Sequence, residues 1–257
     1  MLDLYVATYN QIEMLPIVTE YWKRYPLRKI TLFDNLSTDG TVDYVREHFK
    51  NVEVQSNETK LKDNKVICDW KNSAWKASRG LVDFVIVCDC DEVLYHHEFE
   101  NKLKEAKHHH YSHLVHNPAM ACITAGSVKP VEGHLYHESA RVKFNRFNAD
   151  FGKILLFDPN LVGESNYSVG AHKFKAVGDI KALHSDVELL HFDYLSLDFL
   201  LTRYQNMSQR RSQADIEHGF GTHYTQSVPS LTEQWESRLR IAKRADELSD
   251  VFKRLVA

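Results

Sequence analysis

Several features that would place a chain in a specialised class are missing from this sequence. Its four cysteines form no CxxC pair and no disulfide framework, so a reducing cytoplasm is the expected compartment. No signal peptide is visible, and no apolar run reaches the length of about 20 residues that a membrane-spanning helix needs. A formal net charge of -3 gives no reason to expect a nucleic-acid partner.

What remains is the composition of an ordinary globular protein. The chain has 257 residues, of which 43% are hydrophobic and 26% charged, and this is enough for a substantial core. No internal repeat or low-complexity linker divides it. We therefore expect one domain over residues 1–257, in which residues 1–95 and 96–194 form two halves and residues 195–257 a C-terminal helical extension.

The first half alternates between apolar runs typical of strands and amphipathic runs typical of helices. The pattern predicts strands over residues 2–9, 28–34, 51–56 and 81–93, and helices over residues 12–25, 41–49 and 65–78. Strands that alternate with helices indicate βαβ units and a parallel sheet. The expected fold class is therefore α/β.

Two amphipathic helices are predicted near the C-terminus, over residues 195–218 and 230–256. Ser230 and Glu233 stand at the spacing of a capping box at the start of the second one. Basic residues are frequent in this part of the chain: Arg203, Arg210, Arg211, Arg238, Arg240, Lys243 and Arg244. We expect them on a solvated outer face, with peripheral contact to an anionic membrane as the alternative.

Polar side chains follow three of the predicted strands where each strand ends. The clusters are Thr8/Asn10, Asp34/Asn35 and Asp89/Asp91/Glu92. Because ligands of open parallel sheets bind beyond the carboxyl ends of the strands, we expect all three clusters on one edge of one sheet. The residues from Ser37 to Asp39 are expected to build a turn and cap the next helix, and Gly40 to supply backbone freedom.

The acids Asp89 and Asp91 end the most hydrophobic run of the chain. On an extended backbone, residues two apart project the same way, so the two carboxylates could hold Mg²⁺ or Mn²⁺ together. The alternative is a turn in which they cap the following segment. In either case, carboxylates at the end of a buried strand require cationic partners.

Three motifs in this order resemble the nucleotide-sugar-binding half of GT-A glycosyltransferases, in particular the family 2 group. They are ATYNQIEMLP near the start, LFDNLSTDGTVDYV at the end of the second strand, and VCDCDEVLY as the DxD element. The resemblance covers the first ninety-five residues. It implies a GT-A fold with a mostly parallel, Rossmann-like central sheet flanked by helices.

The same resemblance implies an enzyme that moves a sugar from a nucleotide-diphosphate donor, a UDP-sugar being expected, to a glycan, lipid-linked or small-molecule acceptor. The residues that would bind the nucleotide sugar are Thr8, Asn10, Asp34, Asn35, Lys65, Asp89 and Lys153. Mn²⁺ or Mg²⁺ would be held by Asp89 and Asp91, with His191 or His172 completing the shell. Trp235, or the aromatic residues around Tyr136, would stack on an acceptor sugar.

The chemistry implied is an inverting transfer, which needs a carboxylate to take the proton of the acceptor hydroxyl. Asp91 and Glu92 are the expected catalytic residues, with Glu92 as the base. Glu138, Asp150, Asp179 and Asp186 are the alternatives for the base, and retaining chemistry is the alternative for the stereochemical course.

Two other functions are open at this point. A sugar-nucleotide nucleotidyltransferase has a similar sheet, but it normally carries a glycine-rich basic loop after the first strand, and ATYNQIEML has neither glycine nor lysine. A catalytically inactive module that binds a nucleotide sugar is the second alternative.

Overall fold

The computed structural model describes residues 1–116, 120–124, 142–146, 153–241 and 243–244. The strands are β1 Leu2–Thr8, β2 Leu27–Asp34, β3 Val52–Ser56, β4 Phe84–Asp89, β5 Glu92–Tyr95, β6 His113–Val115, β7 Met120–Thr124, β8 Val142–Arg146, β9 Leu156–Phe157, β10 Val162–Glu164, β11 Val177–Gly178, β12 Ala182–His184, β13 Glu188–Tyr194 and β14 Lys243–Arg244. The helices are α1 Leu15–Trp22, α2 Thr41–His48, α3 Asn64–Ser73, α4 Phe99–His108, α5 Leu197–Gln209, α6 Gln213–Glu217 and α7 Val228–Ile241, with short 3₁₀ turns η1 Ala74–Ser78, η3 Val169–Ala171 and η4 Thr222–Thr225.

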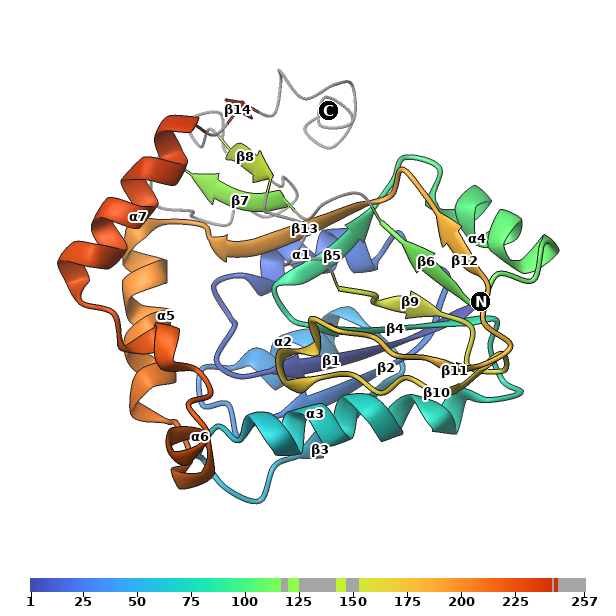
Figure 1. The fold of residues 1–257 in the computed structure, drawn as a ribbon, viewed down its shortest axis with the longest axis horizontal. Helices are drawn as coiled ribbons and strands as arrows, with labels where there is room; N and C mark the ends of the chain where they lie inside the picture. Colours follow the sequence, from blue (N-terminus) through green and yellow to red (C-terminus); the bar gives the residue numbers. More distant parts are fainter. Residues whose placement is uncertain (117–119, 125–141, 147–152, 242, 245–257) are drawn as a thin grey trace.

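The main sheet has the order β12-β6-β9-β4-β1-β2-β3 (Figure 1). Strand β1 pairs in parallel with both β2 and β4, and β2 pairs in parallel with β3. The four strands predicted from the first half therefore form one continuous block of parallel strands in this sheet. Strand β9 runs antiparallel to its neighbours β4 and β6. The α/β prediction is confirmed.

Both faces of the central strands β1 and β4 are covered, which explains why these two strands are mostly apolar rather than alternating. Every residue of β1 is buried. On one face Leu4 and Val6 belong to the same core as Trp22 of α1. On the other face Tyr5 packs in the core that contains Trp75 of η1. Strand β1 thus lies between helix α1 and the α3–η1 segment. This packing fixes the position of the C-terminal end of β1.

A second sheet, of order β14-β8-β7-β13-β5, begins where β4 ends. The chain leaves β4 at Asp89, turns through two residues, and enters β5 at Glu92, which pairs with His191 of β13. The prediction of one strand over residues 81–93 was therefore wrong at its end. Because the backbone turns between Asp89 and Asp91, the two carboxylates are not neighbours on one extended strand.

The C-terminal helices differ from their predicted bounds. The segment predicted as one helix contains two, α5 and α6, because Ser212 caps α6 by accepting from Asp215 N–H at 3.0 Å. Helix α7 begins at Val228, so Ser230 lies inside it and the capping-box prediction was wrong. Ser227 carries the cap, since its carbonyl accepts from the N–H of Leu231 at 3.0 Å. Lys243 and Arg244 pair with β8 as a strand and do not continue the helix.

Helix α6 is tied to the start of α3, and Figure 1 shows the two side by side. The carboxylate of Asp215, 1% exposed, accepts from the backbone N–H of Asn64 at 3.1 Å and from its side-chain amide at 2.6 Å. The backbone of Lys62 also exchanges bonds with Arg210 and Ser212. The helical extension is thereby joined to the nucleotide-sugar-binding half that the sequence predicts.

The variant Asp215→Ala is expected to lower the free energy of unfolding by about 1–3 kcal/mol, because it removes the buried carboxylate that accepts from the backbone and side chain of Asn64. Urea denaturation followed by circular dichroism measures this change. Asp69→Ala is the matched control, since Asp69 is 59% exposed in its ion pair with Lys65. Equal stability of the two variants would show that the hydrogen bonds between Asp215 and Asn64 do not stabilise the fold.

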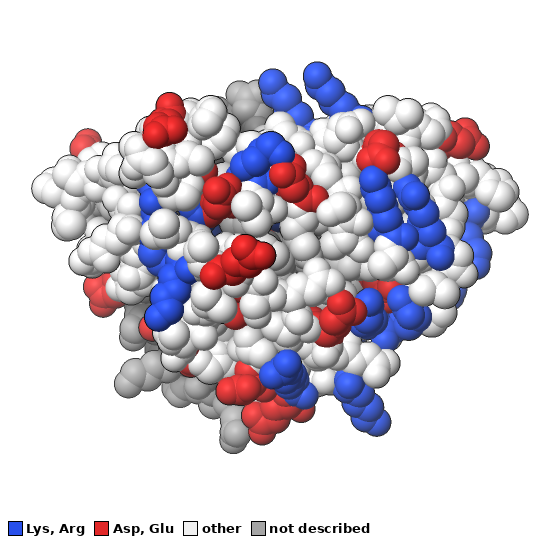
Figure 2. Space-filling view, turned by 90° about the horizontal axis from the view of Figure 1, so that it is seen from below, with Lys and Arg blue, Asp and Glu red and all other residues white. Residues whose placement is uncertain are grey.

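Basic and acidic side chains are interspersed on the face that Figure 2 shows, and no continuous basic stripe crosses it. In the described ranges, no helix has the length and apolarity that a membrane crossing requires.

Candidate active site

The carboxyl ends of three parallel strands lie side by side. In the register of the sheet, Thr8 of β1 pairs with Asp34 of β2, and Ala7 pairs with Asp89 of β4. The N–H of Asn35 donates to the Thr8 carbonyl at 3.0 Å, which continues the ladder one step beyond β2. The predicted convergence of the three polar clusters on one edge is confirmed.

Asp34 and Asn10 shape the loop that follows β2. The Asp34 carboxylate accepts from the N–H of Ser37 at 3.0 Å and from its hydroxyl at 2.5 Å. Oδ1 of Asn10 accepts from Thr38 N–H at 2.8 Å, and the N–H of Asn10 donates to Ser37 Oγ at 2.9 Å. The structure thus places these two predicted nucleotide contacts within the loop, and neither lines the cavity described below.

Asp39 ties the same loop to the segment after β1. Its Oδ2 accepts from Ile12 N–H at 3.0 Å, while Oδ1 accepts from the N–H and hydroxyl of Thr41 at 3.0 and 2.6 Å. Gly40 has φ 92°, in the left-handed region that glycine tolerates, and is itself the N-cap residue of α2. The predicted turn is confirmed, but the cap is Gly40 rather than one of the side chains before it.

A cavity of about 600 Å³ opens at this edge of the sheet. Its walls come from the ends of β1 and β4, from α3 and η3, from β13, and from the helices α5 and α7. Of the residues predicted to bind the nucleotide sugar, those that line it are Thr8, Asn35, Asp89 and Lys153. Lys65 does not: it is 65% exposed and pairs with Asp69.

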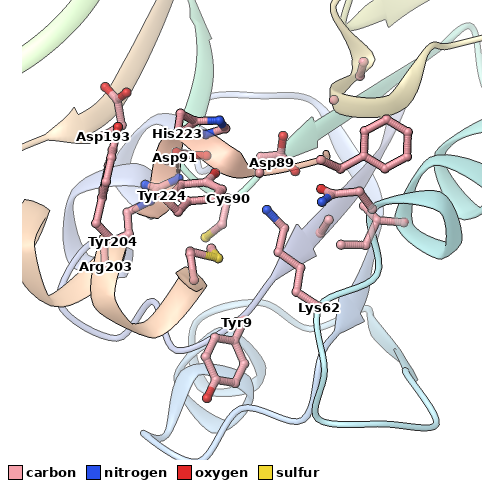
Figure 3. A pocket seen from close by; sticks show the side chains of 18 of the residues that line it. Tyr9, Lys62, Asp89, Cys90, Asp91, Asp193, Arg203, Tyr204, His223 and Tyr224 are labelled. Carbon is pink, nitrogen blue, oxygen red and sulfur yellow. Dashed lines mark hydrogen bonds and ion pairs between the residues drawn. The ribbon is translucent and has the colours of Figure 1, made fainter. Parts of the chain in front are cut away.

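Cations stacked on tyrosine rings stand at several places in the wall. The guanidinium carbon of Arg210 lies 3.1 Å from the ring centroid of Tyr9, and Lys62 Nζ lies 4.6 Å from that of Tyr224. Figure 3 shows Lys62 pointing from its loop into the cavity, with Tyr9 below it. Arg210 also donates to the carbonyl of Asn35 at 3.3 Å. This end of the cavity therefore offers flat, cationic surfaces beside an amide.

Asp89 is held by two lysines. Lys71 Nζ lies 2.7 Å from its Oδ1, and Lys153 Nζ lies 3.0 Å from its Oδ2. Burial disfavours the charged carboxylate, but the two lysines outweigh burial and hold the pKa of Asp89 well below its usual range. Lys71 is itself 3% exposed on α3, so its charge is directed into the cavity.

Asp91 has a different set of partners. Its Oδ2 accepts from Arg203 Nη2 at 2.5 Å and faces His191 Nε2 at 3.1 Å. Burial opposes ionisation of Asp91, but Arg203 and His191 outweigh it, and the pKa of Asp91 lies well below its usual range. For His191, burial favours the neutral ring, but Asp193 and Asp91 outweigh burial and raise its pKa to about 9. The prediction that acids at this strand end need cationic partners is confirmed.

Glu92 turns away from the cavity. It is 2% exposed, and its carboxylate binds Lys153 Nζ at 2.6 Å and accepts from the N–H of Asp89 at 2.9 Å. Lys153 therefore bridges Glu92 and Asp89. Glu92 is absent from the described residues that line the cavity.

The other predicted candidates lie in different places. His172 lines the cavity beside η3, where partial burial and the charge of Lys153 lower its pKa. Asp186 pairs with Lys102 at 2.8 Å on the surface, and neither it nor Asp179 lines the cavity. Trp235 packs partly buried against the core instead of lining the cavity. Tyr136, Glu138 and Asp150 lie outside the described residues.

Asp193 is a cavity residue that the sequence pattern did not single out. Its Oδ1 is buried and has no hydrogen-bond partner among the described residues. Burial raises the pKa of Asp193, although His191 and Arg203 oppose that rise. Its spacing could have revealed it, because it stands two residues after His191 and so projects to the same side of β13.

The basic residues of α5 and α7 were expected on an outer face, and for three of them this was wrong. Arg203, Arg210 and Arg238 line the cavity. Arg203 and Arg210 follow one helical stripe with Met207, which also lines it. The periodicity located this stripe but could not show that it meets a polar cavity instead of solvent.

Aspartates held among cations at the carboxyl ends of parallel strands are typical of α/β enzymes that bind anionic nucleotides. The family described as glycosyl transferase family 2 matches residues 3–162, more than half of the chain. The chain belongs to glycosyl transferase family 2, and it is a transferase of the GT-A type. The predicted resemblance is confirmed.

Solved structures add distant similarities. The crystal structure of S. aureus TarS 1–349 is 15% identical, with 81% of this chain and 64% of that chain covered and a TM-score of 0.48. The same fragment in complex with UDP has the same identity and coverage and a TM-score of 0.44. HddC from Yersinia pseudotuberculosis is 10% identical, with 81% and 99% covered and a TM-score of 0.37. The chain thus spans 64% of the TarS 1–349 length, and no curated protein matches it in sequence.

Proposed function

We propose that this chain is an inverting glycosyltransferase that moves a sugar from a UDP-sugar to a hydroxyl group of a glycan, lipid-linked or small-molecule acceptor. Membership of glycosyl transferase family 2 supports the reaction type. The observation that carries the proposal is the cavity at the ends of β1 and β4, where Lys71, Lys153 and Arg203 surround Asp89 and Asp91. A donor with two phosphates is the ligand that such a charge arrangement suits.

The donor would lie along the cavity with its base at the Tyr9 end. There the Tyr9–Arg210 pair offers a flat surface for the base, and Asn35, 2% exposed with its amide bonded to Asn57 and Leu61, supports the wall behind it. Lys62 reaches towards the middle of the cavity, as Figure 3 shows, where the diphosphate would lie. Thr8 completes this wall.

The DxD element implies a divalent ion, and the residues present fit one in part. Asp91 Oδ2 and His191 Nε2 converge within 3.1 Å, whereas both oxygens of Asp89 are already engaged by lysines. The described residues offer no group of three His, Cys, Asp or Glu side chains that could hold a metal. Asp91, and His191 in its neutral form, are the residues that would hold Mn²⁺ or Mg²⁺. When bound, the ion supplies Lewis-acid stabilisation of the leaving nucleoside diphosphate.

The chain's own cations have a defined part in this reaction. Lys71 and Lys153 lie within 3.0 Å of Asp89 and keep this carboxylate charged and fixed. Arg203 donates to Oδ2 of Asp91 and lines the cavity, so its guanidinium would lie near the diphosphate of a bound donor. There it would stabilise the negative charge that develops as the sugar departs.

The helical extension belongs to this working unit, because α5 and α7 supply part of the cavity wall. We propose on this ground that residues 1–95, 96–194 and 195–257 act as one domain. The described cysteines Cys68, Cys88 and Cys90 are free and buried, which is compatible with the cytoplasm as the compartment.

A donor screen tests the proposal. UDP-, GDP-, dTDP- and ADP-sugars are added with Mn²⁺, with Mg²⁺ and with a chelator, and melting temperature and nucleotide release are measured. A UDP-sugar at 100 times its Kd should stabilise by about 2.7 kcal/mol, a shift of about 5–10 °C for a chain of this size. UDP should be released when a panel of glycosides and lipid diphosphates is added.

The other outcomes decide between the alternatives. Absence of a shift with every nucleotide sugar would contradict the proposal. A shift without transfer to any acceptor would indicate an inactive binding module. Release of pyrophosphate from a nucleoside triphosphate and a sugar phosphate would identify a nucleotidyltransferase. The anomeric configuration of the product, read by NMR, separates inverting from retaining transfer.

A further inference from the structure

The acids that line the cavity differ in what already binds them. Among the described residues these acids are Asp89, Asp91 and Asp193. Two lysines occupy the oxygens of Asp89, and Arg203 and His191 converge on Asp91. Oδ1 of Asp193 is buried and accepts no hydrogen bond from any described residue. A buried carboxylate oxygen in this state calls for a donor other than the described residues, which a bound ligand can supply.

Other buried atoms without a described partner line the same cavity: Oγ1 of Thr8 and Oε1 of Gln11 near β1, and an acceptor on α7. Gln234 of α7 lines it, and Oε1 of this side chain is also buried without a partner in the described part of the chain. Asp193 and Gln234 come from different elements, β13 and α7, so no local turn accounts for both. Two acceptors without donors suit a ligand with several hydroxyl groups, such as a sugar or another polyol.

The surroundings of Asp193 fit the same ligand. Tyr204 lines this part of the cavity, and Figure 3 shows Asp193 beside it on the Arg203 side. Aromatic rings offer a face on which a sugar ring can pack. Tyr9 and Asn35, which we assign to the base end, directly follow β1 and β2, whereas Asp193 belongs to β13 of the second sheet. With the base at the Tyr9 end and the diphosphate beside Asp89 and Asp91, the donor's sugar would lie at the Asp193 end of the cavity.

Glu92, the base predicted from the sequence, is poorly placed to take a proton from an acceptor in the cavity. A base has to come within hydrogen-bond distance of the proton it removes. Glu92 is 2% exposed, and Lys153 at 2.6 Å together with the N–H of Asp89 occupies its carboxylate. Using it as a base would require that buried ion pair to separate.

We propose that Asp193 is the catalytic base of the transfer and that Gln234 positions the acceptor, a ligand with neighbouring hydroxyl groups. This rests on the proposed function. The proton of the acceptor hydroxyl passes to the Asp193 carboxylate while the acceptor oxygen bonds to the anomeric carbon of the donor sugar. The bond from that carbon to the diphosphate oxygen breaks, and its electron pair leaves with the nucleoside diphosphate.

The variant Asp193→Asn tests the proposal, because it keeps the shape of the side chain and removes its ability to take a proton. With the donor and acceptor found in the screen, kcat should fall by about 10²–10⁴-fold. The Kd for UDP, measured by calorimetry with Mn²⁺, should stay within about twofold, because the base acts on the acceptor. Asp198→Asn is the matched control, since Asp198 is an exposed aspartate in the first turn of α5.

A second variant separates positioning from catalysis. Gln234→Ala should raise the KM for the acceptor by about tenfold, the value of one lost hydrogen bond, with kcat and the Kd for UDP nearly unchanged. The proposal is overturned if Asp193→Asn keeps more than a third of the wild-type kcat, or if it loses UDP binding and transfer together. A wild-type chain that binds no nucleotide at all would instead overturn the proposed function.

Discussion

The variant Lys153→Met is expected to lower the free energy of unfolding by about 3–5 kcal/mol, the cost of leaving a buried charge without its partner. Lys153 is 7% exposed and the Glu92 side chain only 1%, and their charges lie 2.6 Å apart. The same ammonium group also holds Asp89 at 3.0 Å. Because a domain is stable by only about 5–15 kcal/mol, the variant should lose a large share of its stability. Urea denaturation at low temperature measures the loss.

Two further variants make this result interpretable. Lys65→Met removes a lysine from an exposed ion pair with Asp69, and we expect it to cost less than about 1 kcal/mol. The double variant Lys153→Met/Glu92→Gln removes both buried charges and should recover part of the loss. Two results would show that the buried charge of Glu92 does not need Lys153 as its partner. One is a loss of unfolding free energy below about 1 kcal/mol in Lys153→Met. The other is a loss in the double variant equal to the sum of the losses in the two single variants.

The sequence predicts the parallel half of the fold well, because there the information is local. The first three strands end in polar residues and are each followed by an amphipathic helix, and the fourth is the most apolar run of the chain. Parallel pairing then brings Thr8, Asp34 and Asp89 to one edge without further assumptions. The turn around Gly40 was equally predictable, since its residue types admit few backbone conformations.

The second sheet was not predictable in the same way. Strand β5 separates from β4 because Glu92 and the residues after it pair with β13, a segment far along the chain. A continuous run of apolar residues and acids cannot show that its two ends belong to different sheets, because the partner that decides this is not local. The turn at Asp91, and with it the separate cation sets of the two aspartates, follows from that pairing.

The position of the C-terminal arginines in the cavity could not be predicted from the sequence for a different reason. An amphipathic helix that carries Arg203 and Arg210 on its polar stripe looks the same whether this stripe faces water or a charged cavity. The hydrogen bonds from Asn64 to Asp215 hold α6 against α3. This contact helps to turn the polar stripe of the preceding helix, α5, towards the cavity. Neither partner is unusual in sequence, so only the assembled fold reveals the contact.

The variant Asp91→Asn is expected to reduce kcat/KM by about 10³-fold and to abolish the effect of Mn²⁺ on UDP binding, if Asp91 and His191 hold the ion. Asparagine can still accept from Arg203, so the buried guanidinium keeps a partner and the variant should stay folded. Alanine would lack this acceptor and would confuse a loss of binding with a loss of structure. Calorimetric titration with UDP, with and without Mn²⁺, measures the effect directly.

Asp83→Asn is the matched control, because Asp83 precedes the same strand that Asp91 follows. It is also ion-paired, to Lys107 at 2.6 Å and to the N-terminal amine at 2.9 Å, but it lies at the opposite end of β4. Normal activity in Asp83→Asn together with its loss in Asp91→Asn would place the effect at the cavity. Should Asp91→Asn keep both its activity and its response to Mn²⁺, the cations Lys71, Lys153 and Arg203 would suffice for the diphosphate, and the DxD aspartates would serve only to orient them.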